Sequence, residues 1–208
     1  MRRLLLVLAL LLAGCGGADA PAEEQLNGIQ LVQALQDGGY VIYLRHAATD
    51  RSKEDAGVVD LQDCSTQRNL SERGVDQAHE IGRAFRELEI PLGDVLTSEY
   101  CRTTQTARLA FARAEPEPTL TGFPNDDAPD YAKRVRATRE LLARRPAAGE
   151  NTVLVAHIKN IEAAAEVSIE EGEVAVFEPL GGTRFRYRGR IPAEAWRQLV
   201  VELGRDAG

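Results

Sequence analysis

Short runs of apolar residues along the chain predict the strands of a central sheet. They lie at residues 39–45 (GYVIYLR), 93–98 (GDVLTS), 151–157 (NTVLVAH), 174–180 (VAVFEPL) and 184–191 (RFRYRGRI). The first and third are continuous apolar runs of a length typical of buried strands. The last two flank Gly181 and Gly182, which predict a turn between neighbouring strands.

Between these runs, apolar residues recur at a spacing of three and four, which predicts helices. The predicted helices cover residues 71–90, 99–112, 130–144 and 192–203. Ser71 is the expected N-cap of the first helix. The apolar face of that helix consists of Ala78, Ile81, Phe85 and Leu88. Val135 and Leu142 are expected core residues of the third, and Pro192 lies in the first turn of the last.

Strands and helices alternate through the middle of the chain, which predicts a three-layer α/β/α sandwich with a mainly parallel central sheet. We expect one folded domain over residues 28–208, without internal repeats. Binding sites in such sheets form beyond the carboxyl ends of the strands. Arg45 and His46 follow one predicted strand and His157 ends another, so we expect them at one edge of the sheet.

The N-terminal residues have the pattern of an export signal. Residues 1–14 contain two arginines, an apolar run and small residues, in the order of a secretory signal peptide. The sequence LAGC resembles a bacterial lipobox, which implies cleavage before Cys15 and lipidation of that cysteine. An ordinary signal peptide or an uncleaved anchor is the alternative. Residues 15–27 are small, polar and acidic, which predicts a flexible tether.

These features predict a bacterial envelope protein that a lipid anchor holds to the membrane. Gly16 follows the cysteine, in place of the aspartate associated with inner-membrane retention, so we expect the periplasmic face of the outer membrane if the host has two membranes. An exported chain meets an oxidising compartment, which predicts a disulfide between Cys64 and Cys101. The alternative is two separate buried thiols.

The charge of the chain restricts its partners. The 208 residues carry a formal net charge of -7, which argues against a broad nucleic-acid-binding surface. A small anionic substrate remains compatible with this charge, because a few arginines can dominate one pocket of an acidic protein. No spacing of the histidines suggests a metal site, and we expect no cofactor. The oligomeric state is left open.

Four residues that follow predicted strands combine into a candidate anion site. Arg45 and Arg102 offer planar guanidinium groups, which match phosphate oxygens in a bidentate manner. A helix that begins near residue 99 directs backbone N–H groups toward the same edge. His46 and His157 add two imidazoles, and a neutral imidazole is a competent nucleophile. The group therefore predicts phosphate chemistry.

Four segments carry a resemblance to a known family. LRHAATD, NLSERGVDQAHEIGRAF, LTSEYCRTTQTARLAF and VLVAHIKNIEAA resemble, in this order, motifs of the histidine phosphatase superfamily, also called phosphoglycerate-mutase-like. The chain looks most similar to its exported bacterial branch with one compact domain. The resemblance implies a phosphoglycerate-mutase-like fold and a metal-independent phosphomonoester hydrolase that forms a phosphohistidine. It also implies a small phosphorylated substrate.

The resemblance also assigns roles to single residues. It implies that His46 is the nucleophile, that Arg45 and Arg102 bind phosphate, and that His157 binds phosphate and stabilises the developing charge. Thr49 either bonds a phosphate oxygen or caps a turn.

Other positions depart from the family pattern. Ala47 and Ala156 replace common glycines, and Ile158 stands where one branch has a catalytic aspartate. The general acid is therefore open among Glu99, Asp126, Asp127 and Asp130, with Glu99 ranked first because it shares an edge with Arg102.

The missing aspartate motivates an alternative function: a catalytically weak or inactive envelope lipoprotein that binds phosphate or a partner. A mutase is a weaker third hypothesis. His79 is expected at the surface of its helix. For four further residues, the sequence does not decide between a role in the site and a purely structural role: Arg68, Asn69, Lys159 and Asn160. The segments at residues 50–67 and 115–130 are short, which suggests an open site and does not identify the substrate.

Overall fold

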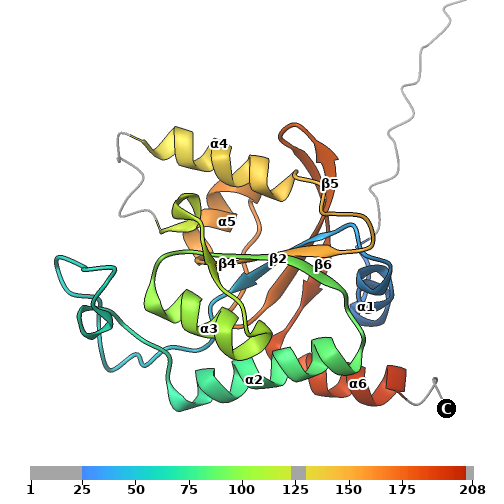
Figure 1. Cartoon of the computed structure of the whole chain (residues 1–208), viewed down its shortest axis with the longest axis horizontal. Coiled ribbons are helices and arrows are strands. Elements are labelled where there is room, and N and C mark those ends of the chain that lie inside the picture. Colours follow the sequence, from blue (N-terminus) through green and yellow to red (C-terminus); the bar gives the residue numbers. More distant parts are fainter. Residues whose placement is uncertain (1–24, 123–129, 205–208) are drawn as a thin grey trace, which may run out of the picture.

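The computed structural model describes residues 25–122 and 130–204, which form a six-stranded sheet between two layers of helices (Figure 1). The predicted three-layer α/β/α sandwich with a mainly parallel sheet is confirmed. Cys15, Asp126 and Asp127 lie outside the described residues. Within the described ranges, no helix is long and apolar enough to cross a membrane.

The sheet has the strand order β3-β2-β4-β1-β5-β6. Its strands are β1 (Val41–Arg45), β2 (Leu92–Thr97), β3 (Glu115–Pro116), β4 (Asn151–Ala156), β5 (Val174–Gly181) and β6 (Arg184–Ile191). The first four run parallel, and β5 and β6 pair in an antiparallel manner. The centre of the sheet is the parallel pair β1 and β4, which are the two continuous apolar runs of the sequence.

Helices cover both faces of the sheet (Figure 1). One layer contains α1 (Gly28–Asp37), α2 (Glu72–Glu87), α3 (Cys101–Phe111) and α6 (Trp196–Gly204). The other contains α4 (Tyr131–Leu142) and α5 (Ile158–Ala165). Helix α1 has no counterpart among the predicted helices, although Asn27 and Gln30 form a complete capping box at its start.

Alternate residues of β1 point into two separate cores. Ile42 and Leu44 belong to the core beneath α1, α2 and α6, whereas Val41 and Tyr43 belong to the core beneath α4 and α5. All four are fully buried, as a central strand covered on both faces requires. Burial on both faces holds the end of β1 at a defined place, and this is where Arg45 and His46 begin.

The predicted details of α2 are confirmed. Ser71 caps the helix by accepting a hydrogen bond from the N–H of Gly74, and the four residues of the apolar face are buried. Gly74 also allows a close approach: a Cβ atom there would lie 1.9 Å from the carbonyl oxygen of Ala48. The start of α2 therefore packs directly against the segment that follows His46. In α4, Leu142 is buried as predicted, whereas Val135 is only half-buried.

A disulfide joins Cys64 to Cys101, as the sequence predicts, with 5.7 Å between their Cα atoms. It connects α3 to a largely exposed loop, residues 50–69, that extends away from the sheet (Figure 1). At its base, the loop is closed by a hydrogen bond of 3.0 Å from the N–H of Asp50 to the carbonyl oxygen of Asn69. The loop is therefore anchored at its base and at one point of its length.

Candidate active site

The pairing of β1 with β4 brings the two predicted histidines together. Arg45 lies opposite Ala156 in the parallel register, and the N–H of His46 donates to the Ala156 carbonyl oxygen at 3.0 Å. His46 and His157 therefore leave the sheet at the same level. Their ring centroids are 5.5 Å apart, and both residues are buried.

Among the described residues, one ring nitrogen of His46 has a hydrogen-bond partner and the other has none. Its Nδ1 lies 2.9 Å from the carbonyl oxygen of Ala47, an acceptor, so Nδ1 carries the proton and donates it. The N–H of Ala47 in turn donates to Thr106 Oγ1 at 3.0 Å, which fixes the peptide beside the ring. Burial lowers the pKa of His46 to about 4, with Arg102 and Arg45 adding to the effect. The ring is neutral at pH 7, and Nε2 is left with its lone pair.

His157 is held from two sides. Its Nε2 lies 2.8 Å from Ser98 Oγ, at the end of β2, and its carbonyl oxygen accepts a hydrogen bond of 2.7 Å from the Tyr43 hydroxyl. Burial, followed by the neighbouring His46 and Arg102, lowers the pKa of His157 well below its usual value. When Ser98 donates to Nε2, the proton of the neutral ring lies on Nδ1, which can donate to a ligand.

Three arginines contribute to the same cavity from three parts of the chain. Arg45 follows β1 and donates through Nη1 to the carbonyl oxygen of Ile169 at 2.9 Å. Arg102 lies in the first turn of α3, and Arg68 lies at the end of the loop of residues 50–69. Within the part of the chain that the structure describes, the buried Nε of each of these arginines has no hydrogen-bond partner. Buried donors without partners are unusual in proteins and indicate a missing acceptor.

Asp55 and Tyr100 complete the surroundings of Arg102. Its Nη1 donates to Asp55 Oδ1 at 3.0 Å and to the carbonyl oxygen of Arg68 at 3.3 Å. Its guanidinium lies over the Tyr100 ring, 4.2 Å from the centroid, and the same ring contacts His157 edge-on. These contacts orient Arg102 before any ligand binds.

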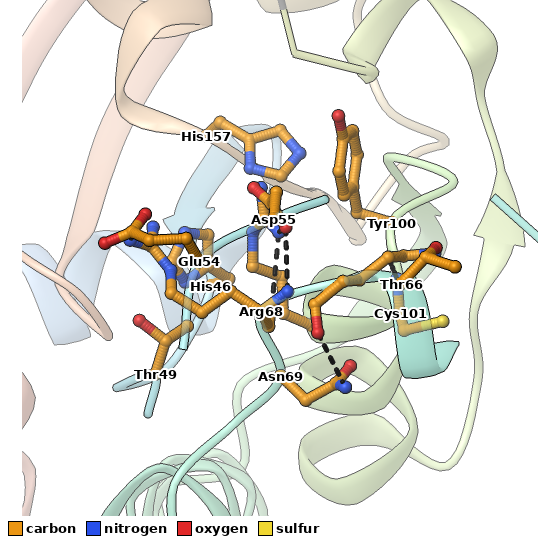
Figure 2. Close-up of polar contacts among 12 residues, drawn as sticks. His46, Thr49, Glu54, Asp55, Thr66, Arg68, Asn69, Tyr100, Cys101 and His157 are labelled. Atoms are coloured by element: carbon orange, nitrogen blue, oxygen red, sulfur yellow. Dashed lines mark hydrogen bonds and ion pairs between the residues drawn. The ribbon is translucent and has the colours of Figure 1, made fainter. Parts of the chain in front are cut away.

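These residues line one cavity of about 600 Å³, which we call the histidine cavity (Figure 2). Its lining consists of Arg45, His46, Asp55, Ala56, Arg68, Tyr100, Arg102, Gly122, His157, Ile158 and Lys159. The structure thus brings together Arg45, His46, Arg102 and His157, as the sequence predicts. Within residues 25–122 and 130–204, no group of three or more His, Cys, Asp or Glu side chains is arranged to hold a metal ion.

Two predicted site residues are not among those that line the histidine cavity. The Thr49 hydroxyl donates to Glu171 Oε1 at 2.9 Å, and Thr49 pairs with Leu70 at the base of the loop. Glu99 accepts a hydrogen bond of 3.0 Å from Thr121 Oγ1 and lines a second cavity of about 710 Å³ beside the disulfide. Glu99 and Cys101 line the second cavity, whereas Tyr100 and Arg102 line the histidine cavity, so alternate residues at the start of α3 face different cavities. The ranking of Glu99 as general acid therefore has no support in the geometry.

Of the remaining residues that the sequence analysis considered, some line the histidine cavity and others lie elsewhere. Asp130 precedes α4, where its carboxylate pairs with Arg134, and it does not line the histidine cavity. Lys159 lines the cavity, whereas Asn160 is fully buried and its side-chain amide has no partner within the described ranges. Asn69 donates to the carbonyl oxygens of Cys64 and Gln67 and lines the second cavity. His79 is exposed on α2, as expected.

Asp55 and Tyr100 are the polar lining residues that the sequence reasoning did not assign to the site. Asp55 lies in an exposed, polar loop, where carboxylates are common and local pattern carries no signal. Tyr100 lies between Ser98 and Arg102 in a segment that resembles a family motif. Its place in that segment could have indicated that it lies in the site.

Comparisons with known proteins agree with this geometry. A family model described as histidine phosphatase superfamily (branch 1) matches residues 41–122, which include Arg45, His46 and Arg102. No curated protein matches the chain. The fold is similar to that of solved histidine phosphatase structures, although sequence identity to them is low.

Three solved structures illustrate the similarity in fold. A mutant phosphoserine phosphatase from Entamoeba histolytica, in complex with phosphoserine, has a TM-score of 0.52 at 12% identity, over 74% of this chain and 98% of its own. The protein histidine phosphatase SixA with tungstate has a TM-score of 0.51 at 15% identity, over 74% and 97%. Mycobacterial glucosyl-3-phosphoglycerate phosphatase has a TM-score of 0.51 at 20% identity, over 72% and 97%.

Proposed function

We propose that the chain is a histidine phosphatase that hydrolyses a phosphomonoester through a phosphohistidine on His46. The observation that carries the proposal is one cavity that brings together His46, His157 and the guanidinium groups of Arg45, Arg68 and Arg102. A phosphoryl group supplies oxygen acceptors for these guanidinium groups, and its phosphorus is the electrophile for the imidazole.

Binding would begin with the phosphate oxygens between Arg45 and Arg102, which approach from β1 and α3 respectively. Arginine retains its charge when buried, so each side chain offsets part of the dianion charge in a cavity that excludes much of the water. Arg68 and Lys159 add further positive charge to the lining. The position of the phosphate is then set by groups that are already ordered.

In the first step, His46 Nε2 attacks phosphorus in line with the ester oxygen. The P–O bond breaks, and the electron pair leaves on the ester oxygen. The Nδ1 proton, held by the carbonyl oxygen of Ala47, stabilises the positive charge of the phosphorylated ring. A neutral His157 donates from Nδ1 to a phosphoryl oxygen as charge develops there. In the second step, water attacks phosphorus and the electron pair of the P–N bond returns to His46.

The arginines and histidines perform the charge stabilisation in this scheme, so we propose that the reaction does not depend on a metal ion. Activity that is unchanged after dialysis against EDTA is the expected result. Activity that is lost with EDTA and restored by a divalent cation would contradict this part of the proposal.

The direct test is hydrolysis of para-nitrophenyl phosphate by the purified full-length protein. We expect the substitution His46→Ala to reduce kcat/KM by about 10⁴-fold or more, as removal of a covalent nucleophile does in other hydrolases. His79→Ala is the matched control, because His79 is an exposed histidine on α2. Undiminished turnover by the His46 variant would exclude it as the nucleophile.

Trapping of the intermediate separates catalysis from mere binding. Brief exposure to a ³²P-labelled substrate should leave an acid-labile, base-stable label on the wild-type protein and none on the His46→Ala variant. Tight binding of phosphate without any label would instead support the non-catalytic alternative.

We also propose that the protein is attached to the bacterial envelope through a lipid on Cys15, and this part rests on the sequence of residues 1–15. Cells fed a labelled fatty acid should transfer the label to the wild-type chain and not to a Cys15→Ser variant. Equal labelling of both chains would refute the lipid anchor at this position.

A further inference from the structure

The lining of the histidine cavity contains a single carboxylate, that of Asp55, among the residues that the structure describes. Its Oδ1 accepts hydrogen bonds from Arg102 Nη1 at 3.0 Å and from the backbone N–H of Arg68 at 2.8 Å. No hydrogen bond or ion pair of the described residues involves its Oδ2. One oxygen thus anchors the carboxylate, and the other is free to exchange a proton.

Other nearby carboxylates are already engaged elsewhere. Glu171 is bonded to Thr49 and paired with Arg45, and it does not line the histidine cavity. The Glu54 side chain is 85% exposed and lies 4.0 Å from Arg68. Glu99 faces the second cavity. A proton donor for the leaving oxygen has to reach that oxygen, and among the described residues Asp55 is the carboxylate that lines the histidine cavity.

The loop that carries Asp55 is fixed to the helix that carries Arg102. The disulfide joins Cys64 of the loop to Cys101, which precedes Arg102 directly. Beside it, the N–H of Cys101 donates to Gln67 Oε1 at 2.8 Å, and the N–H of Ala56 donates to the carbonyl oxygen of Thr66 at 2.9 Å. These links hold Asp55 in place although it lies in a largely exposed loop and outside its short 3-10 helix, Cys64–Thr66.

We propose that Asp55 is the acid and base of the reaction, an inference that rests on the proposed function. In the first step, Asp55 transfers its proton to the ester oxygen as the P–O bond breaks, so the alcohol leaves neutral. In the second step, the Asp55 carboxylate accepts a proton from the attacking water, the P–N bond breaks, and phosphate and a neutral His46 result. Asp55 is then protonated again, and the cycle closes.

Substrate binding changes the surroundings of Asp55. In the ligand-free site, Arg102 pairs with Asp55. A phosphate dianion that binds to Arg102 competes for the same guanidinium and brings two negative charges next to the carboxylate. The Arg102–Asp55 pair thereby links the phosphate site to the proposed acid.

The test compares Asp55→Asn with the wild type on two substrates whose leaving groups differ in basicity. An alkyl phosphate needs a proton on its leaving oxygen, whereas nitrophenolate leaves without one. We expect Asp55→Asn to slow the single-turnover phosphorylation of His46 by about 10²–10⁴-fold with the alkyl phosphate. With para-nitrophenyl phosphate, we expect an unchanged burst of nitrophenolate, then slow turnover and accumulation of labelled phosphohistidine.

Three further variants make the result specific. Glu54→Gln removes a neighbouring carboxylate of the same loop and should leave both substrates unaffected. Asp55→Glu retains the carboxylate and should restore part of the alkyl phosphate activity, whereas Asp55→Ala should behave like Asp55→Asn.

The outcomes separate this inference from the proposed function. An equal loss on both substrates in the burst phase, with a raised KM, would overturn the inference and leave Asp55 as a residue that only positions Arg102. A wild-type protein that neither turns over nor becomes labelled would overturn the proposed function, and the inference with it.

Discussion

The two walls of the histidine cavity are built in different ways. The sheet wall consists of Arg45, His46 and His157, at the carboxyl ends of two strands that are buried on both faces. The loop wall consists of Asp55 and Arg68, in a segment that is mostly exposed and is held by backbone hydrogen bonds, one disulfide and Arg102. Figure 2 shows side chains from both walls around one space.

This difference indicates how each wall keeps its geometry. The sheet wall is a continuation of the hydrophobic core, so its position depends on the stability of the whole domain. The loop wall depends on a few specific polar and covalent contacts, and it can change while the core stays intact. The residues of the proposed covalent step belong to the sheet wall, and the proposed proton transfer belongs to the loop wall.

Arg102 contacts the loop wall through Asp55 and Arg68 and lines the cavity beside the sheet wall. Its removal should reduce activity more than the other changes described below. We expect Arg102→Ala to lower kcat/KM for para-nitrophenyl phosphate by about 10²–10³-fold, because the variant loses a preorganised charge at the phosphoryl oxygens and the partner of Asp55. Arg108→Ala is the control on the exposed face of the same helix. A similar loss in both variants would contradict a specific role for Arg102.

Removal of the disulfide should lower the stability of the chain and, in the folded protein, loosen the loop wall. For a separation of 37 residues, the chain-entropy model predicts that the double substitution Cys64→Ser, Cys101→Ser lowers the free energy of unfolding by about 3–4 kcal/mol. Urea unfolding measures this change. The folded variant should also turn over alkyl phosphates more slowly, because the position of Asp55 relative to Arg102 is no longer fixed.

The nitrophenolate burst of this double variant should stay close to that of the wild type, since the sheet wall is unchanged. A burst that is lost together with alkyl phosphate turnover would show that the two walls are not independent.

Acid conditions should affect the sheet wall through His46. Burial lowers its folded-state pKa to about 4, against 6.5 for an unperturbed histidine. Between these values the unfolded chain binds a proton that the folded protein does not, so the free energy of unfolding decreases as the pH falls from about 6.5 to about 4. Above this window the contribution of His46 is fully present.

Urea unfolding across this pH range measures the effect. His46→Ala should show a shallower decrease than the wild type, and His79→Ala, which removes an exposed histidine, should follow the wild type. Identical pH dependence in the His46 variant and the wild type would contradict a buried neutral His46.

Much of the sheet wall could be predicted from the sequence. The continuous apolar runs that precede His46 and His157 predict strands that are buried on both faces. A few consecutive residues are enough for this prediction. Two such strands place their carboxyl ends at one edge, which brings both histidines and Arg45 together before any distance is known. The prediction of the disulfide rests on the expected export of the chain and on the cysteine count.

The loop wall could not be predicted in the same way. The expected shared edge with Arg102 favours Glu99 as the general acid, yet the two side chains line different cavities at the start of α3. Thr49 follows His46 closely, yet its hydroxyl is bonded to Glu171. Sequence proximity does not determine which side of a helix start or turn a side chain faces, because this depends on partners far away in the chain.

The sequence by itself therefore determined the layers, the strands and the histidine and arginine pairs at their ends, because hydrophobic periodicity is a local property. Only the tertiary structure decided that Asp55 and Tyr100 line the cavity and that the guanidinium groups of three arginines meet there. Those features depend on contacts across 34 and 47 residues, from Arg102 to Arg68 and to Asp55, and on a disulfide across 37. Polar contacts between residues so far apart in the chain leave no repeating pattern in the sequence from which they could be predicted.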